Sequence, residues 1–534
     1  MKSRVRVRHC RHILCVFPRY APSFGTFQHA YRLMDGVRAF MPPQGLLVVA
    51  AYLPERWEVR LVDENIRAAT AADLAWADAV FVSGMHVQRA EIAAIAGRAR
   101  AAGRVSVIGG PSVSASPEHY PEFDYLHVGE IGDATDRLIA ALDEDVSAPA
   151  AQRRFATAER LPLGDFPIPA YELIEGRRYF LGSIQFSSGC PYRCEFCDIP
   201  ALYGRQPRLK RPEQITAELD ALLAAGILGS IYFVDDNFIA NKKAARALLP
   251  HLVAWQKRRG YPVQLSCEAT LNIAACPDIL EMMREAYFCT VFCGIETPEL
   301  EALGAMQKSH NLVMPILDAV GALNRRGLEV VSGIILGLDT DTPATASRLI
   351  DFIEHSQIPV LTINLLQALP KTPLWERLAA AGRLAPDGER ESNVVFVRPY
   401  AEVLENWRTA IRHAYRPEAI YRRFAYQARA TYPNRIRPPV TRARLSRANL
   451  RRAAVILAKV FGKIGLFADY RRIFWRMAGP ALRAGNIEQL IQVALVAHHM
   501  IRFARDCTAG RQNASFYADR AKAPAEAPER LAGD

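Results

Sequence analysis

Residues 187–197 read SSGCPYRCEFC and set Cys190, Cys194 and Cys197 in the spacing C-x3-C-x2-C. Three thiolates in so short a loop can bind three of the four irons of a cubane [4Fe–4S] cluster. The fourth iron then has no protein ligand, so a small molecule with an amine and a carboxylate can chelate it. A zinc knuckle normally has four protein ligands, and no further Cys or His follows closely behind Cys197. The loop therefore predicts an iron–sulfur site, against the alternatives of a zinc knuckle or three incidental thiols.

This loop resembles that of the radical S-adenosylmethionine (SAM) enzymes, which carry an aromatic residue before the last cysteine, as Phe196 does here. The resemblance implies that SAM binds the open iron and that an electron from the reduced cluster breaks its carbon–sulfur bond. Further along the chain are Cys267, Cys276, Cys289 and Cys293. We interpret these four as small buried hydrophobic residues, with a second cluster as the alternative.

The length of 534 residues predicts two or three domains, and an apolar content of 50% is typical of globular proteins. The ten cysteines are scattered apart from those in the loop, and the apolar run behind the basic N-terminus is too short for a secretory signal. No apolar run reaches the about 20 residues that span a bilayer. These features predict a cytoplasmic protein with a metal site rather than a disulfide framework.

Before the cysteine loop, short apolar runs alternate with helical patterns. The expected strands are residues 13–17, 57–63, 79–83, 105–108 and 125–128, and the expected helices include residues 46–53 and 91–102. Apolar strands that alternate with helices are typical of a parallel, doubly wound sheet. The ligand crevice of such a sheet lies at the carboxyl ends of its strands.

This pattern resembles the cobalamin-binding domain that precedes many radical SAM modules. The residues that the resemblance assigns to cobalamin follow three predicted strands and are Ser83, Met85, His86, Gly109, Gly110, Pro111, Ser112, Gly129 and Glu130. Glycines allow close approach of the nucleotide tail because they lack a Cβ atom. The D-x-H-x-x-G motif that supplies a cobalt ligand in other cobalamin proteins is absent. His86 could ligate cobalt, but a lone loop histidine is more often a surface or hydrogen-bonding residue.

Behind the cysteine loop, the alternation of strands and helices resumes. The expected strands are residues 184–187, 230–234, 264–267, 290–294, 329–336 and 359–365, and helical patterns cover residues 212–225 and 242–259. Six strands with helices between them predict a partial (β/α)6 barrel. Its chemistry would lie at the carboxyl ends of the strands.

The ends of these strands carry the residues that the radical SAM resemblance assigns to SAM. They are Asp236, Glu268, Glu296 and, within the sequence GIILG, Gly333, Ile335 and Gly337. The glycine pattern would pack beside the adenine, and the carboxylates would bind the ribose or the amino group. The alternative for each carboxylate is a helix N-cap or a salt bridge.

The last third of the chain holds much of the net charge of +12, as arginines mixed with apolar residues. Residues 451–467 favour a basic amphipathic helix suited to a membrane surface. Residues 487–503 favour a second apolar helix, in which His498 and His499 argue against a membrane span. A packed helical bundle with a solvated basic face would explain the same pattern.

The predicted fold class is α/β with a helical C-terminal extension. Its parts are a doubly wound, Rossmann-like cobalamin-binding domain (1–145), a linker rich in Ala, Pro and Arg (146–180), a radical SAM partial barrel (181–385), an Arg-rich helical domain (386–510) and a polar tail expected to be disordered (511–534).

The order of these parts resembles the bacterial hopanoid methylases that act at C-2. The stretches CVFPRY (15–20), FMPPQGL (40–46) and CDIPALYGR (197–205) are especially similar. The resemblance covers nearly the whole chain and implies methyl transfer through methylcobalamin to an unactivated carbon of a triterpenoid lipid. It further implies an electron donor for the cluster, and the basic helices fit a peripheral position at the anionic inner membrane surface.

Three alternatives stay open. A related cobalamin-dependent enzyme could act on a tetrapyrrole, a peptide or an antibiotic precursor. A tRNA methylthiotransferase would explain the positive charge, but that class needs three more cysteines in its N-terminal domain, where this chain has only Cys10 and Cys15. We therefore expect no nucleic acid partner. A non-catalytic cobalamin or iron–sulfur sensor would need degenerate SAM-contacting strand ends, and Glu296, Gly333 and Gly337 argue against that.

Overall fold

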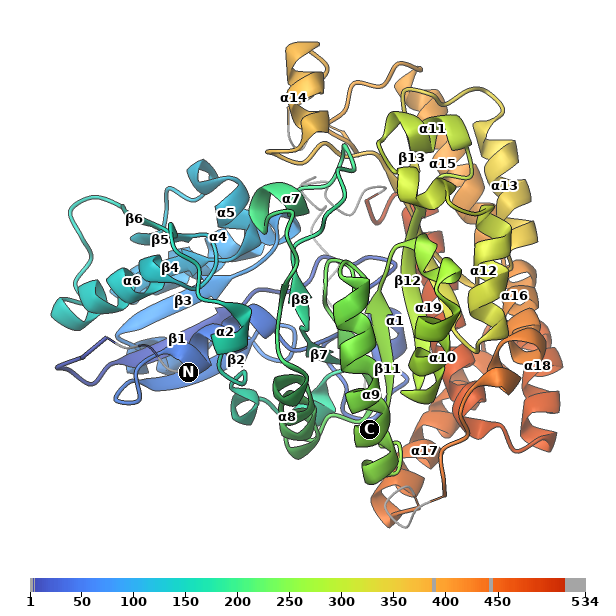
Figure 1. Ribbon diagram of the computed structural model, residues 1–534, viewed down its shortest axis with the longest axis horizontal. Helices are drawn as coiled ribbons and strands as arrows, with labels where there is room; N and C mark the ends of the chain where they lie inside the picture. The colour runs from blue at the N-terminus through green and yellow to red at the C-terminus, as the bar shows by residue number, and fades with distance from the viewer. Residues whose placement is uncertain (1–2, 4, 387–389, 441–444, 514–534) are drawn as a thin grey trace.

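The computed structural model describes residues 3, 5–386, 390–440 and 445–513. It contains two large sheets, and the first is N-terminal (Figure 1). All pairings in this sheet are parallel, in the order β2-β1-β3-β4-β5-β6. Its strands are β1 (His12–Phe17), β2 (Glu58–Asp63), β3 (Ala79–Ser83), β4 (Val105–Gly109), β5 (Tyr125–Val128) and β6 (Arg153–Ala156). The accompanying helices are α2 (Gln44–Tyr52), α3 (Ala71–Trp76), α4 (Arg89–Ala101), α5 (Pro111–Ala115) and α6 (Asp133–Glu144).

Strand β1 explains why this sheet is doubly wound. Ile13, Cys15 and Phe17 belong to one hydrophobic core, and Leu14 and Val16 belong to another. Successive side chains of a strand point to opposite faces, so a strand that is apolar at every position must be covered on both faces. The predicted doubly wound sheet is confirmed.

Strand β6 lies inside residues 146–180, the segment expected to be only a linker. It pairs with β5 at the edge of the sheet, and of its residues only Phe155 is buried while Arg153 and Arg154 are exposed. Charged side chains are common on edge strands, where they discourage further pairing. A strand of this composition has no apolar run, and for that reason the sequence pattern did not reveal it.

The second sheet also has six parallel strands, in the order β14-β13-β12-β11-β10-β7. They are β7 (Gly182–Ile184), β10 (Gly229–Phe233), β11 (Val263–Glu268), β12 (Phe288–Glu296), β13 (Glu329–Leu336) and β14 (Val360–Leu365). The helices between them include α8 (Pro212–Ala224), α9 (Lys242–Arg259), α10 (Pro277–Glu285), α12 (Ile316–Arg325) and α13 (Thr345–Ser356). This arrangement confirms the partial (β/α)6 barrel.

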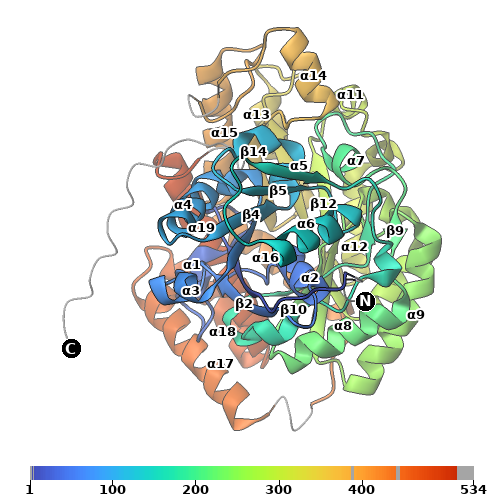
Figure 2. The same ribbon diagram turned by 90° about the vertical axis from the view of Figure 1, so that its left-hand side faces the viewer.

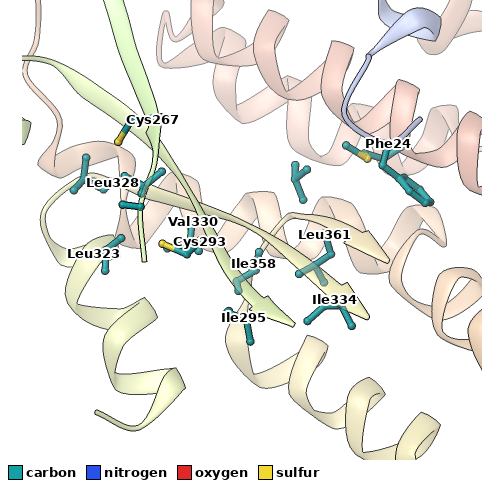
Figure 3. Close-up of a cluster of buried hydrophobic side chains, with 14 of the residues drawn as sticks. Phe24, Cys267, Cys293, Ile295, Leu323, Leu328, Val330, Ile334, Ile358 and Leu361 are labelled. Atoms are coloured by element: carbon teal, nitrogen blue, oxygen red, sulfur yellow. The ribbon is translucent and has the colours of Figure 1, made fainter. Parts of the chain in front are cut away.

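The predicted strand at residues 184–187 divides in two. Its first part is β7, and Ser187–Ser188 form β8, which pairs antiparallel with β9 (Arg208–Leu209). On β11 and β12, Cys267 and Cys293 lie among the aliphatic side chains of the barrel core (Figure 3). Cys276 and Cys289 are buried as well.

The C-terminal region is helical and covers the side of the barrel away from the N-terminal sheet (Figure 1). Its helices are α14 (Pro373–Ala380), α15 (Tyr400–Ala414), α16 (Pro417–Ala430), α17 (Arg447–Val460), the π-helix η9 (Phe461–Leu466), α18 (Arg471–Arg483) and α19 (Ile487–Thr508). No helix among the described residues is long and apolar enough to cross a membrane. Of the predicted tail, residues 514–534 lie outside the described residues.

The N-terminal loop between β1 and α2 connects the three parts. It contains α1 (Gln28–Tyr31), which packs against α19 (Figure 2 shows both on the same side of the molecule). Phe24 stacks on Tyr415 and meets the edge of Phe503, and His499 lies 3.2 Å from the carbonyl oxygens of Ser23 and Phe24. The helical region therefore holds the loop in place. The exact domain limits stay a prediction.

Candidate functional site

A cavity of about 820 Å³ lies between the carboxyl ends of the two sheets. Its lining from the N-terminal sheet includes Ser83, Met85, Gly109, Gly110, Pro111, Gly129 and Glu130. Its lining from the barrel includes Asp235, Asp236, Glu268, Phe292, Thr362 and Asn364. The carboxyl ends of parallel strands are where both kinds of sheet bind ligands, and here the two edges share one cavity.

The cysteine loop begins at β8 and is held by the end of β10. Asp235 accepts hydrogen bonds from the backbone N–H groups of Phe186 and Ser187, and Asp236 accepts one from Gly189 at 2.7 Å. Gly189 has φ +95°, and a Cβ atom there would lie 2.9 Å from the carbonyl oxygen of Gly204. Only glycine fits this position.

The three loop thiols are near one another and only partly exposed. Burial raises the pKa of Cys197 most strongly, and the neighbouring Cys194 and Cys190 raise it further. Among the described residues, no three His, Cys, Asp or Glu side chains converge as the ligands of a single ion would. A cubane cluster is bound differently, because each thiolate ligates a separate iron.

A buried ion pair borders the cysteine loop. Lys308 Nζ lies 2.6 Å from Glu296 Oε1 and 5.4 Å from the centre of the Phe196 ring. Glu296 ends β12 at a bulge and has φ +67°, which is rare for a residue with a side chain. Glu296 thus forms a salt bridge, which was one of the alternatives to SAM binding for a carboxylate at this strand end. Sequence reasoning missed Lys308, because nothing in its loop position indicates its partner.

Two carboxyl groups face the cavity from neighbouring strands. Burial raises the pKa of Asp236 to about 6 and that of Glu268 to about 7, although the Tyr232 hydroxyl, which donates to Glu268 at 3.1 Å, works in the opposite direction. Buried carboxyl groups of this kind are stabilised in their charged form by a cationic ligand. The structure thus brings Asp236 and Glu268 together as predicted.

The other residues assigned to SAM are absent from the described lining of the cavity. They are Phe196, Glu296, Gly333, Ile335 and Gly337. At Gly337 the space of a side chain is filled, because a Cβ atom would lie 2.5 Å from the Phe396 ring. Phe396 comes from the segment after the barrel, so the barrel pattern alone could not predict this contact.

Close packing requires the glycines at the carboxyl edge of the N-terminal sheet. Gly110 has φ +97°, and a Cβ atom there would overlap Ser83 Oγ at the end of the neighbouring strand. Pro111 then begins α5 at the position where helices favour proline. Gly129 has φ +103° and donates its N–H to Ser114 Oγ at 2.8 Å. These turns keep the crevice open next to the backbone.

Glu130 links the N-terminal sheet to the short antiparallel pair of β8 and β9. Its carboxylate lies 2.6 Å from Arg208 on β9 and 3.1 Å from Arg160. Arg208 also donates to Ser188 Oγ at 2.9 Å, so the ion pair reaches the strand that leads into the cysteine loop. Glu130 therefore fixes the N-terminal crevice relative to the cysteine loop, which the sequence did not predict.

His86 and Ser112 lie apart from the lining of the cavity. His86 begins the short 3-10 helix η1 (His86–Gln88), and its ring centre is 5.7 Å from that of His119. Ser112 is buried and hydrogen-bonds with the Tyr120 hydroxyl. Met85, by contrast, does line the cavity.

Three family models match successive parts of the chain. They are the B12 binding domain (residues 33–139), the radical SAM superfamily (184–353) and a domain of unknown function, DUF4070 (372–513). The radical SAM domain implies a [4Fe–4S] cluster and SAM, and the B12 binding domain implies cobalamin. The three predicted cofactors are thereby confirmed.

Individual proteins and solved structures are similar over 71% to 97% of this chain. The hopanoid C-2 methylase of Rhodopseudomonas palustris (strain TIE-1) is 60% identical over 519 residues, 97% of this chain and 98% of that protein. The fold is similar to that of the cobalamin-dependent S-adenosylmethionine radical enzyme OxsB (TM-score 0.57, 14% identity, 95% of this chain and 82% of that chain). It is also similar to the radical S-adenosylmethionine methyltransferase TsrM from Kitasatospora setae (TM-score 0.55, 20% identity, 71% and 78%). The chain is a cobalamin-dependent radical SAM methyltransferase and belongs to the family of the hopanoid C-2 methylase.

Proposed function

We propose that this protein methylates an unactivated carbon of a hopanoid, at C-2. The observation that carries the proposal is the 60% identity to a hopanoid C-2 methylase over 97% of this chain. The cavity supports it, since its lining combines residues from the cobalamin-binding fold and from the radical SAM barrel. When bound, the cofactors supply hydrogen abstraction from an unactivated carbon and transfer of a methyl group to it.

Cys190, Cys194 and Cys197 would hold the cluster. Their thiols are partly exposed, lie on one loop and interact electrostatically, which fits a set of three ligands. Asp235 and Asp236 position this loop through its backbone N–H groups. Lys308 would lessen the negative charge beside Cys194, because its ammonium group already lowers the pKa of that thiol against the effect of burial.

Asp236 and Glu268 would receive the cationic part of SAM. Both line the cavity, and both have raised pKa values that a positive ligand would lower. Glu296, paired with Lys308, would position the cysteine loop rather than contact SAM. Gly333 and Ile335 would shape the barrel around the adenine from β13, and Phe396 fills the space next to Gly337.

The crevice at Ser83, Gly109, Gly110 and Gly129 would hold cobalamin. Its glycines lie at strand ends that line the cavity, where the backbone is accessible to a ligand. The lining of the cavity also includes apolar and aromatic side chains, among them Phe17, Phe24, Phe40 and Met41. Such a wall would accept a polycyclic hydrocarbon and keep water from the reacting carbon.

Two partners complete the proposal. An external electron donor must reduce the cluster, and the lipid substrate requires access to a membrane. The protein would meet an anionic membrane surface peripherally, through the basic helices of its C-terminal region.

The test is mass spectrometry of lipids from a bacterium that makes hopanoids, with and without this gene. The wild-type gene should restore a methylated hopanoid, and a Cys194→Ala version should not. Cys10→Ala, an exposed thiol outside the loop, is the matched control and should restore it fully. An unchanged hopanoid profile on deletion would refute the hopanoid substrate and favour a tetrapyrrole, peptide or antibiotic precursor.

A further inference from the structure

The turn between α17 and α18 presents apolar side chains to solvent. Leu466 is 64% exposed, Phe467 84% and Trp475 38%. Trp475 Nε1 donates to the Gly465 carbonyl oxygen at 2.9 Å, and its ring stacks on Phe461. A Cβ atom at Gly465 would lie 2.9 Å from the same indole. We call Leu466, Phe467 and Trp475 the apolar tip; the contacts hold its indole against the turn that carries Leu466.

The apolar tip begins at Leu466, the last residue of the π-helical turn η9. The N–H of Phe467 donates to the carbonyl oxygen of Gly462 at 3.3 Å, which continues the wider spacing of that turn. Short π-helical segments are rare and frequently occur at functional sites. Lys463 is exposed one π-turn before Phe467, so a cation and an aromatic ring project from neighbouring positions.

Lys463 has two further cations beside it. After burial, the largest causes that lower its pKa are Arg32, at the end of α1, and Arg502, on α19. All three side chains are exposed, and in the described part of the chain none has an ion pair with a carboxylate. We call Arg32, Lys463 and Arg502 the cation cluster. Three gathered cations of this kind are suited to an anionic partner.

The surrounding sequence is almost free of negative charge. Residues 445–486 contain nine Lys or Arg and one acidic residue, Asp469. Asp469 is already bound by Arg505 at 2.7 Å. Exposed Trp, Phe and Leu side chains among unopposed cations are the composition of segments that lie in the interface of an anionic bilayer.

The cation cluster is also connected to the cavity. Arg32 ends α1, which follows directly on the loop whose Phe24, Gly25 and Thr26 line the cavity. Helix α1 packs against α19, which carries Arg502. A bilayer on this face would therefore lie beside the loop that forms part of the cavity wall.

We propose that the apolar tip and the cation cluster together form a docking surface for an anionic phospholipid bilayer. The inference rests on the proposed function, because a triterpenoid substrate is a membrane lipid, and it names the surface through which the enzyme reaches that lipid. Phosphate groups of the lipids would bind Arg32, Lys463 and Arg502, while Leu466 and Phe467 enter the headgroup region.

The experiment is cosedimentation of the full-length protein with sucrose-loaded vesicles. Vesicles of phosphatidylcholine alone are compared with vesicles containing equal parts of phosphatidylcholine and phosphatidylglycerol, at low and high salt. Wild-type protein should bind the anionic vesicles, and salt should weaken the binding. Phe467→Asp/Lys463→Glu should weaken it by at least about tenfold, because both the apolar insertion and the attraction to the headgroups are lost.

The matched control is Leu317→Asp/Arg325→Glu on α12. Leu317 is 45% exposed and Arg325 is exposed, so the control makes the same changes of charge and hydrophobicity on another face. Its vesicle binding should equal that of the wild type. The proposal would be overturned if the two double variants lost vesicle binding equally, or if wild-type binding did not depend on phosphatidylglycerol. It would also be overturned if the cation cluster bound RNA in preference to vesicles.

A second measurement separates this proposal from the proposed function. With hopanoid dispersed in detergent, the tip variant should turn over substrate like the wild type, because no bilayer has to be reached. If neither protein methylates the hopanoid while vesicle binding still depends on Phe467 and Lys463, the substrate proposal fails and the docking surface stands.

Discussion

Lys308 Nζ and Glu296 Oε1 are 2.6 Å apart, and only 6% and 8% of the two residues are exposed. Burial works to lower the pKa of Lys308, but Glu296 and then Cys194 outweigh it, so the pKa lies above its ordinary value. Glycine at position 294 makes room for the pair, since a Cβ atom there would overlap the Glu296 carboxylate. The ion pair of Lys308 and Glu296 thus helps to hold the cysteine loop in position.

Lys308→Met should destabilise the protein strongly. It leaves the Glu296 carboxylate buried without a partner, which costs about 3–5 kcal/mol. The double variant Lys308→Met/Glu296→Gln removes both charges and should recover most of that loss. The free energies of unfolding from denaturant titration of the three proteins check this. A single variant as stable as the double variant would contradict the role given to the pair.

Gly189→Ala should abolish retention of the cluster. The added Cβ atom meets the Gly204 carbonyl oxygen, and relief of that contact would displace Cys190, the next residue. The control is Gly229→Ala, because Gly229 has nearly the same φ, +93°, but nothing within 4 Å of its Cβ position. Iron and sulfide per chain after anaerobic reconstitution should fall only in Gly189→Ala. Equal iron contents would show that the loop tolerates the displacement.

Gly110→Ala should weaken cobalamin binding by at least about tenfold, because relief of the overlap with Ser83 Oγ must move one of two strand ends that line the crevice. Gly103→Ala, in the turn between α4 and β4, is the control, with φ +66° and open space around its Cβ position. Absorbance of the cobalamin that remains after gel filtration measures the difference. Full retention by Gly110→Ala would place the cofactor elsewhere.

His86→Ala should leave the absorption spectrum of bound cobalamin unaltered. Met85 lines the cavity, whereas His86 belongs to η1 and lies near His119. A spectrum that changes to a different axial-ligand signature would show that His86 binds cobalt. The same spectrum recorded for Met85→Ala tests whether the neighbouring side chain contacts the cofactor.

The parts of the site that follow from strand periodicity were predictable. Asp236 and Glu268 follow or end neighbouring apolar strands of the barrel, and Gly110 follows a strand of the N-terminal sheet. Parallel strands bring their ends to one edge of a sheet, so the sequence indicates which edge of each sheet lines a ligand site. The remaining contacts join distant segments. The bulge that turns Glu296 toward Lys308 and the packing of Phe396 on Gly337 depend on tertiary structure, which no local pattern encodes.

The sequence predicted the helices of the C-terminal region but not where they end, because the helix ends also depend on tertiary packing. Residues 451–467 were expected to form one amphipathic helix, but the structure ends α17 at Val460 and continues as η9. Ile456 and Val460 are buried in the bundle, whereas Leu466 and Phe467 are exposed. The apolar residues of this segment are compatible with a membrane-surface helix and with a packed bundle. The structure divides them near Gly465, whose carbonyl oxygen accepts a hydrogen bond from Trp475: those before it pack, and those after it face solvent.

His499 should make the protein sensitive to acid. It is buried against the Ser23 and Phe24 carbonyl oxygens, and burial lowers its pKa from 6.5 to about 3. Below pH 6.5 the unfolded chain binds a proton that the folded chain does not, so this contribution to stability is complete above pH 6.5 and is lost as the pH falls. At pH 5 the loss is about 2 kcal/mol. His498, with its pKa also lowered to about 3 by burial, adds a second loss in the same direction.

The variant His499→Gln keeps a donor for the carbonyl groups but no longer titrates. Between pH 7.5 and 5, its thermal midpoint should therefore fall less than that of the wild type, and His498 should account for a remaining decrease. The carboxyl groups with raised pKa values, such as Asp235 and Glu268, have the opposite dependence, but they are the same in both proteins and cancel in the difference. Parallel curves for the two proteins would mean that the folded and unfolded chains bind protons equally at position 499, and that burial does not lower the pKa of His499.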